Sequence, residues 1–384
     1  MKIVIIGGGV AGLAFGSIMQ KKGHEVSINE RGKNIPLGGN AFMMHEDGQK
    51  ILRSILGKKN NLPGREVNRF VFNRPNGESL MNTPMESWRC MKRSDLISTL
   101  VTAVKKNTIK YDRAFSHFLF DSGIAVAAVF ENGEVETGDL FVGADGCHSA
   151  VRQLIFGDTH FSTTEVKEIL GTVKDKELVS SLNNTFTKFQ DKEKGLSFGF
   201  IPVSEDEMVW FSQFDAKMEK GPLVSKESIM SFAKELLIDF PEKVKNIVDK
   251  TSLQDFYLWN TKDFDPLTSF HSANIVLVGD SAHVSLPFTS AGTTNALIDA
   301  DVLSNCLENN LFLSEALRQF YEERIESVRQ HVNAGRKLKN EFLHPNTKSS
   351  NSISIPLIKD AVIKKEEKQK DKLEILYFTD PICS

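Results

Sequence analysis

The sequence contains little cysteine, little net charge and no long apolar run. Its cysteines, Cys90, Cys147, Cys306 and Cys383, are far apart in the chain, which indicates neither a disulfide framework nor a metal site. The net charge of −3 gives no electrostatic attraction to nucleic acid or to an anionic membrane. The apolar run Ile3–Ile6 is too short for a signal peptide, and no stretch approaches the ~20 residues that a membrane-spanning helix needs. We therefore expect a reduced, cytoplasmic protein.

Tyrosine is also scarce, with 4 residues against 27 phenylalanines, which favours an apolar aromatic interior or pocket, although lineage bias gives the same ratio. Hydrophobic residues make up 40% of the chain and charged residues 25%, as in ordinary globular proteins. A length of 384 residues suffices for one large domain or two ordinary ones.

The N-terminal stretch predicts a strand, a tight turn, a helix and a second strand. The buried run Ile3–Ile6 leads into Gly7, Gly9 and Gly12, which fit G-x-G-x-x-G, and the second strand ends at Glu30. This arrangement is typical of the first βαβ unit of a dinucleotide-binding fold. The alternative is a glycine-rich turn that binds nothing.

Each residue of this unit has a physical role. Gly7 allows a sharp turn, Gly9 lets a pyrophosphate approach the backbone, and Gly12 lets the helix pack against the sheet. The helix N-terminus offers free N–H groups to the phosphates. A carboxylate at Glu30 accepts hydrogen bonds from a ribose diol and repels a 2′-phosphate, so FAD or NAD is favoured over NADP.

Further elements follow from hydrophobic periodicity and turn residues. A hairpin is expected at Asn76-Gly77, and a β-meander over residues 115–142. A buried strand at Ile275–Val278 ends in Gly279-Asp280, where open α/β sheets place ligands. Helices are expected at residues 47–57, 93–104, 225–237, about 297–307 and 313–342.

Residues 161–270 predict a mainly antiparallel sheet, with paired strands at Leu196–Ile201 and Met208–Phe214. Its aromatic side chains form either a substrate wall or ordinary sheet core, and the candidates for the wall are Phe198, Phe200, Trp210 and Phe211. The fold class is thus α/β, a Rossmann-like dinucleotide-binding domain with an inserted, mainly antiparallel β-sheet substrate domain and a C-terminal helix. The expected division is 1–160 with 271–310 for the discontinuous nucleotide domain, 161–270 for the inserted sheet, 311–343 for the long helix and 344–384 for the tail.

Three separated motifs carry a family resemblance. They are the N-terminal glycines with Glu30, the stretch Gly143–Arg152 (GADGCHSAVR) and the stretch Gly279–Asp299, which begins GDSAH. Their order and spacing resemble those of the single-component, FAD-dependent aromatic hydroxylases, the group A flavoprotein monooxygenases. That family includes p-hydroxybenzoate hydroxylase, salicylate hydroxylase and the tetracycline-inactivating monooxygenases. The resemblance covers roughly residues 1–340.

The resemblance implies a role for each matching position. The ADP half of FAD is expected at Gly7, Gly9, Val10, Ala11, Gly12, Glu30 and Arg31. Arg93 is expected at the ribityl or phosphate region, and Asp145, Gly146 and Arg152 at both FAD and NAD(P)H. Gly279 and Asp280 are expected at the ribityl chain, and Pro287, Gly292, Thr293 and Thr294 beside the isoalloxazine ring.

The chain departs from the family pattern near the ring. Many relatives have Pro-x-x-Gly-x-Gly, whereas Ser290 replaces the first glycine and Thr294 occupies the usual asparagine position. His283 has no metal-ligand spacing around it and is expected to be structural. His45 lies in a segment that approaches the flavin in relatives, so a covalent link to the flavin is an alternative, but non-covalent FAD is expected.

The resemblance implies hydroxylation of an aromatic or polyketide-like small molecule, with O2 and with NADH or NADPH as reductant, through a flavin C4a-hydroperoxide. No side-chain nucleophile is required, and the catalytic groups other than the flavin stay unassigned. We expect a monomer or weak dimer. The alternatives are a flavin-dependent halogenase, a reductase of the geranylgeranyl-reductase type and a flavin-binding protein without catalysis. The stretch FGFIP at residues 198–202 lacks the tryptophans of the halogenase motif W-x-W-x-I-P.

Overall fold

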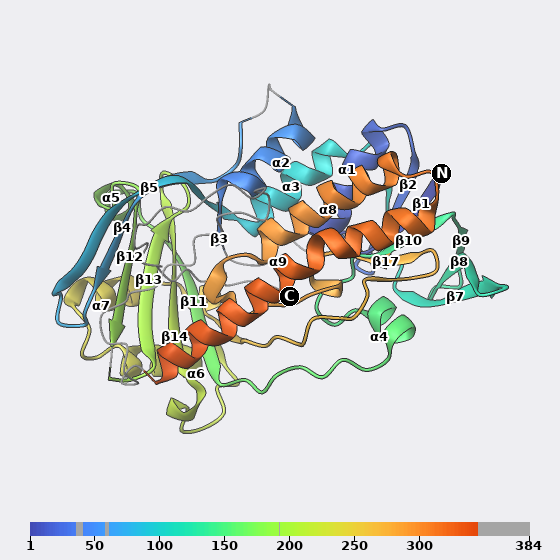
Figure 1. Ribbon diagram of the computed structural model, residues 1–384. Helices are drawn as coiled ribbons and strands as arrows, with labels where there is room; N and C mark the ends of the chain where they lie inside the picture. Colours follow the sequence, from blue (N-terminus) through green and yellow to red (C-terminus); the bar gives the residue numbers. More distant parts are fainter. Residues whose placement is uncertain (36–40, 58–60, 192, 345–384) are drawn as a thin grey trace, which may run out of the picture.

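The computed structural model describes residues 1–35, 41–57, 61–191 and 193–344, and all of the expected tail beyond residue 344 lies outside these ranges. The described chain forms a six-stranded, an eight-stranded and a three-stranded sheet (Figure 1). Among the helices of these ranges, none has the length and apolar composition that a membrane crossing requires.

The six-stranded sheet is parallel except at one edge. Its central strands, β17, β10, β1 and β2, are almost entirely buried, which explains why each reads as a short apolar run without alternation. The strand order is β16 (His271–Ser272), β17 (Ile275–Leu277), β10 (Leu140–Gly143), β1 (Lys2–Ile6), β2 (Glu25–Asn29) and β6 (Ile109–Lys110), with β16 antiparallel.

Two layers cover this sheet. A bundle of helices lies on one face, and a three-stranded meander lies on the other (Figure 1). Phe118 and Phe130 of the meander share the core cluster with Phe141 of the parallel sheet. The helices are α1 (Val10–Lys21), α2 (Glu46–Leu56), α3 (Arg93–Ala103) and α8 (Gly292–Asn309), and the meander is β7 (Phe115–Asp121), β8 (Ile124–Phe130) and β9 (Val135–Thr137).

The eight-stranded sheet is curled and mostly antiparallel (Figure 1). Its outer face packs on α6 (Lys226–Leu236) and α7 (Glu242–Asp249) through a cluster that contains Phe198 and Trp210. We call the opposite side, which carries Phe186 and Phe211, the inner face. The strand order is β15 (Tyr257–Asn260), β11 (Val166–Lys174), β14 (Glu207–Asp215), β13 (Leu196–Pro202), β12 (Thr185–Asp191), β4 (Arg65–Asn73), β5 (Ser79–Lys92) and β3 (Ala41–Met44).

The predicted fold class is confirmed, and part of the predicted nucleotide domain contributes strands to the other large sheet. Residues 41–92 were assigned to the nucleotide domain, whereas β3, β4 and β5 belong to the eight-stranded sheet. Strand β4 joins these strands to the rest of the sheet, because it pairs in parallel with β12, with Phe70 opposite Phe186. Strand patterns show that a segment is a strand, but they do not show which distant strand it joins.

The long helix α9 (Leu313–Leu343) lies along both large sheets (Figure 1). Near its end, Lys339 pairs with Glu165 and Phe342 contacts Phe288. The remaining short elements are α4 (Ala150–Phe156), α5 (Lys176–Ser181), η1 (Ala216–Met218), η2 (Leu253–Asp255), η3 (Gly279–Ser281) and η4 (Pro287–Thr289).

The outer face of the eight-stranded sheet provides a test of packing. A Cβ at Gly171 would lie 2.4 Å from the indole of Trp210, which is buried and donates to Thr251 Oγ1 at 2.8 Å. Gly171→Ala should therefore lower the free energy of unfolding by about 1–3 kcal/mol, measured by urea unfolding. Gly221→Ala is the control, because a Cβ there meets nothing within 4 Å. Equal unfolding midpoints for the two variants would contradict this packing.

Candidate functional site

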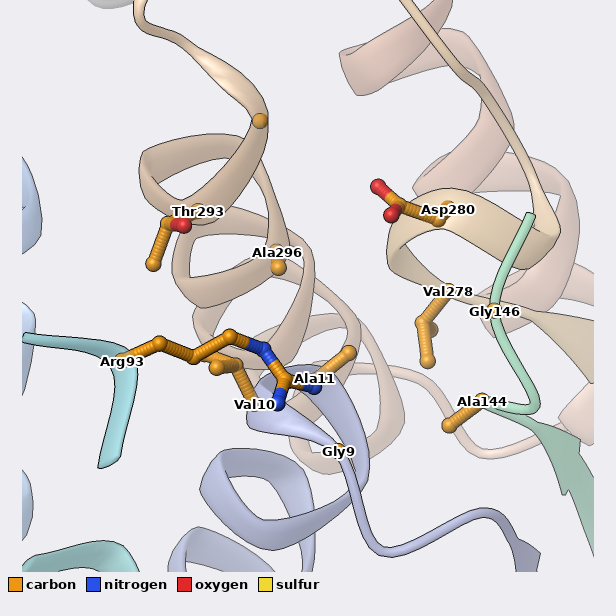
Figure 2. A pocket seen from close by; sticks show the side chains of 11 residues that line it. Gly9, Val10, Ala11, Arg93, Ala144, Gly146, Val278, Asp280, Thr293 and Ala296 are labelled. Atoms are coloured by element: carbon orange, nitrogen blue, oxygen red, sulfur yellow. The ribbon is translucent and has the colours of Figure 1, made fainter. Parts of the chain in front are cut away.

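A pocket of about 500 Å³ lies at the ends of three neighbouring parallel strands, β1, β10 and β17 (Figure 2). Open α/β sheets bind ligands at this edge, where the strands end and the loops diverge. The lining comes from five separate parts of the chain and consists of Gly9, Val10, Ala11, Arg93, Ala144, Gly146, Val278, Asp280, Gly292, Thr293 and Ala296.

The three glycines of the first turn have different structural requirements. At Gly7, where φ is +111°, a Cβ would lie 2.2 Å from the carbonyl oxygen of Ala144, and at Gly12 it would lie 2.2 Å from that of Gly7. At Gly9 the only atom within 4 Å is the Ala144 oxygen, at 4.0 Å. Packing thus requires glycine at Gly7 and Gly12, whereas at Gly9 the missing side chain leaves the pocket floor open.

The floor also offers backbone donors. Helix α1 begins directly after Gly9, which caps it without a side-chain hydrogen bond, and its first turn contains no acidic residue. Its first N–H groups and the positive end of its dipole suit a phosphate. The open floor and this donor set fit the pyrophosphate of a dinucleotide.

Glu30 lies at the end of β2 and does not line the pocket. Its buried carboxylate accepts hydrogen bonds from the backbone N–H groups of Gly8 and Gly32, each at 2.9 Å. These contacts fix the carboxylate, and each oxygen retains a further lone pair for a ribose hydroxyl. Its neighbour Arg31 is exposed.

Two charged side chains of opposite sign face the pocket. Arg93, at the start of α3, extends across it toward Ala11, and the carboxylate of Asp280 faces the gap from η3 (Figure 2). A guanidinium fork suits a phosphate, and a carboxylate suits hydroxyl groups. The structure thus brings two distant predicted residues to one cavity.

Within the Gly143–Arg152 motif, only Gly146 and the intervening Ala144 line the pocket. Ser149 caps α4, and the Asp145 carboxylate holds this turn by accepting from Ser149 Oγ at 2.6 Å and from the backbone N–H of Val151 at 3.1 Å. Burial raises the pKa of Asp145, and these hydrogen bonds oppose the increase.

Arg152 connects this loop to the loop after β17. It is buried and donates to the backbone oxygens of Cys147 at 2.6 Å and Ser281 at 3.0 Å. Its guanidinium also lies 4.6 Å from the centre of the Phe264 ring. Arg152 therefore positions two pocket loops without lining the pocket.

Near the start of α8, Gly292 and Thr293 line the pocket, whereas Pro287 and Thr294 are buried outside its lining. Ser290, at the position where relatives have glycine, has a φ of +50°. Within the described chain, the buried hydroxyls of Thr289, Ser290 and Thr294 make no hydrogen bond. These three hydroxyls lie outside the pocket lining but close in sequence to Gly292 and Thr293, which line it.

For three members of the predicted substrate wall, the structure corresponds to the sheet-core alternative. Phe198, Phe200 and Trp210 lie in the outer-face cluster under α6 and α7, and the rings of Phe198 and Trp210 are stacked 5.3 Å apart. Phe211 alone lies on the inner face. Alternation showed which residues share a face but not which face helices would cover.

Sequence reasoning missed three pocket residues, namely Ala144, Val278 and Ala296. Each is small and lies within or near a recognised motif: Ala144 precedes Asp145, Val278 precedes Gly279, and Ala296 lies one helical turn after Gly292. Their position close to a motif glycine is the feature of the sequence that could have identified them as pocket residues.

The family described as FAD binding domain matches residues 1–334. The 3-amino-4-hydroxybenzoate 2-monooxygenase of Streptomyces cremeus is 26% identical over 367 residues, which cover 90% of this chain and 88% of that protein. The FAD-dependent urate hydroxylase of Klebsiella pneumoniae is 22% identical over 352 residues, which cover 88% and 89%.

Solved structures show the same fold. Klebsiella pneumoniae HpxO complexed with FAD and uric acid aligns with a TM-score of 0.82 at 19% identity, covering 90% of each chain. The tetracycline destructase Tet(51) aligns with a TM-score of 0.67 at 20% identity, covering 89% of this chain and 91% of that one. The chain belongs to the FAD-binding domain family, as an enzyme of the FAD-dependent monooxygenase type.

Proposed function

We propose that this enzyme uses NADH or NADPH and O2 to hydroxylate an aromatic or polycyclic small molecule. The observation that carries the proposal is the pocket, whose open glycine floor and Arg93–Asp280 pair suit a dinucleotide flavin. When bound, FAD would supply the redox chemistry: with a hydride from NADH or NADPH, one oxygen atom of O2 would be added to the substrate and the other would leave as water.

The residues of the chain bind and orient the cofactor non-covalently in this proposal. The floor at Gly9 and the start of α1 hold the pyrophosphate, and Arg93 donates to a phosphate or ribityl oxygen. Asp280 accepts from a ribityl hydroxyl, and Glu30 accepts from the adenosine ribose. The N-terminus of α8, at Gly292, stabilises negative charge on the reduced ring.

A substitution at Gly9 tests cofactor binding separately from folding. Gly9→Val should destabilise the apoprotein less than a substitution at Gly7 or Gly12 does, because no protein atom lies closer than 4.0 Å to a Cβ at Gly9. Its methyl groups would occupy the pocket floor and weaken FAD binding by about tenfold or more, measured by flavin fluorescence titration. Gly12→Ala is the contrasting variant, since its Cβ meets the Gly7 oxygen at 2.2 Å and should destabilise the apoprotein itself. Unchanged FAD affinity in Gly9→Val would argue against this floor.

The inner face of the eight-stranded sheet is the proposed substrate wall. At one end, Val166 of this face packs with Leu286 and Phe288, which flank Pro287 of the expected ring loop. Such a wall would exclude water from the reacting atoms.

A row of buried polar side chains crosses this inner face. Lys188 Nζ donates to Gln213 Oε1 at 3.3 Å, and Gln213 Nε2 donates to Glu168 Oε1 at 2.7 Å. Burial lowers the pKa of Lys188 to about 8, although Glu168 opposes the decrease. Buried charges rarely add stability over apolar packing, and perturbed groups gather at functional sites. We assign the row to recognition of an acidic group or ring N–H on the substrate.

Lys188→Met tests this assignment. We expect the KM of an acidic aromatic substrate to rise by about tenfold or more, with FAD affinity unchanged, because a charged partner is lost. Phe198→Leu is the control, since it alters the outer face of the same sheet. A KM equally affected in both variants, or in neither, would contradict the assignment.

The reaction itself is tested by NAD(P)H oxidation against phenols, hydroxybenzoates, quinolones, tetracyclines and uric acid. We expect at least one compound to stimulate oxidation and to gain one oxygen atom by mass spectrometry. Catalase separates coupled hydroxylation from release of H2O2. No stimulation and no mass gain across the panel would count against a hydroxylase.

A further inference from the structure

A fully buried carboxylate connects the pocket loops to the long helix. Asp299, in α8, accepts hydrogen bonds from the backbone N–H of Gly279 at 2.7 Å and from Arg324 Nε at 2.6 Å. It also lies 2.7 Å from His283 Nε2. Gly279 directly precedes Asp280 of the pocket, and Arg324 belongs to α9, so one side chain joins three elements.

The same network reaches the first turn of α8. Arg324 Nη2 donates to Asn295 Oδ1 at 2.9 Å, and Asn295 Nδ2 lies 3.1 Å from His331 Nδ1. Burial, together with the charges of Arg324 and His283, lowers the pKa of His331 to about 4. His331 is therefore neutral near pH 7 and accepts from Asn295. Asn295 follows Thr293 of the pocket lining by two residues.

Charge balance keeps Asp299 ionised. Burial by itself raises the pKa of this carboxyl, but the charges and hydrogen bonds of His283 and Arg324 outweigh burial, so its pKa falls well below the ordinary value. Both Asp299 and Arg324 are at most 1% exposed. Because apolar residues of similar size often stabilise a fold as well as a buried ion pair does, stability alone does not explain this network.

The groups that the network holds indicate its role. Gly279 has a φ of +62°, and a Cβ there would lie 3.0 Å from that of Ala11, so the turn is tightly placed between α1 and α8. The bond to Asp299 orients this turn, and Asp280 then faces the pocket (Figure 2). The Arg324–Asn295 contact holds the N-terminus of α8 on the opposite wall.

We propose that Asp299, held by Arg324, is a positioning residue for FAD: it fixes Asp280 and the N-terminus of α8 in the geometry that binds the cofactor. The proposal concerns the bound cofactor and needs no substrate. Its failure would therefore leave the hydroxylation proposal standing, and failure of hydroxylation would leave this one standing.

The test is FAD titration of the Asp299→Asn apoprotein, well below its unfolding temperature. The amide cannot accept from all three donors and carries no charge, so FAD binding should weaken by about 10- to 100-fold. The visible absorption band of the bound flavin should also shift, because its donors and acceptors move. A purely structural role would change only the unfolding temperature.

Arg336→Met is the matched control. Arg336 also lies on α9 and also pairs with a buried aspartate, since its Nε donates to Asp263 Oδ2 at 2.7 Å, but neither residue lines the pocket. This variant should lower the unfolding temperature and leave FAD affinity and spectrum unchanged.

Arg324→Lys is the second variant that tests the positioning role, for the case in which Asp299→Asn does not fold. It keeps the charge but loses the fork that reaches both Asp299 and Asn295, so FAD binding should weaken measurably with a shifted spectrum. Wild-type affinity and spectrum in whichever variant folds, or an equal loss of affinity in Arg336→Met, would overturn the proposal.

Discussion

The rest of the structure depends on the close approach of the first turn to the end of β10. A Cβ on Gly7 would lie 2.2 Å from the Ala144 oxygen, and one on Gly12 would lie 2.2 Å from the Gly7 oxygen. These contacts bring α1 onto the sheet and leave its N-terminus facing the strand ends. The pocket exists because the backbone alone fills this space, so that Gly9 meets no side chain.

Around this fixed point, two buried charged side chains, Arg152 and Asp299, hold the loops of the pocket. Arg152 connects the Gly146 loop to η3 through backbone oxygens, and Asp299 connects η3 to α8 and α9. Both act from behind the pocket wall. Loops that carry function lack a ladder of backbone hydrogen bonds, so side chains must fix them. This division explains why several motif residues are essential to the site geometry without lining it.

The features predicted correctly are those determined by residues that lie close together in the sequence. The Ile3–Ile6 strand, the glycine turn and the helix that begins at Arg93 are each encoded within about a dozen residues, and their motifs converge on one pocket. Other features depend on distant partners. The pairing of β4 with β12 joins segments more than a hundred residues apart, and Phe198 became core because α6 and α7 cover its face. The burial of Asp299 could not be predicted either, because its partner Arg324 belongs to another helix and an aspartate within a helix is usually exposed.

The two ends of the proposed cofactor site differ in how many of their polar groups find hydrogen-bond partners within the protein. At the adenosine end, the Glu30 carboxylate already has two backbone donors, and the glycine turn fits its surroundings. At the ring end, Ser290 holds a left-handed φ that glycine would adopt without strain, and three buried hydroxyls lack partners in the described chain. A protein tolerates local strain and unmet hydrogen bonds where a ligand or a moving loop compensates for them. In the proposed placement of FAD, these unsatisfied groups lie near the flavin ring, at the positions where this sequence also departs from the family pattern.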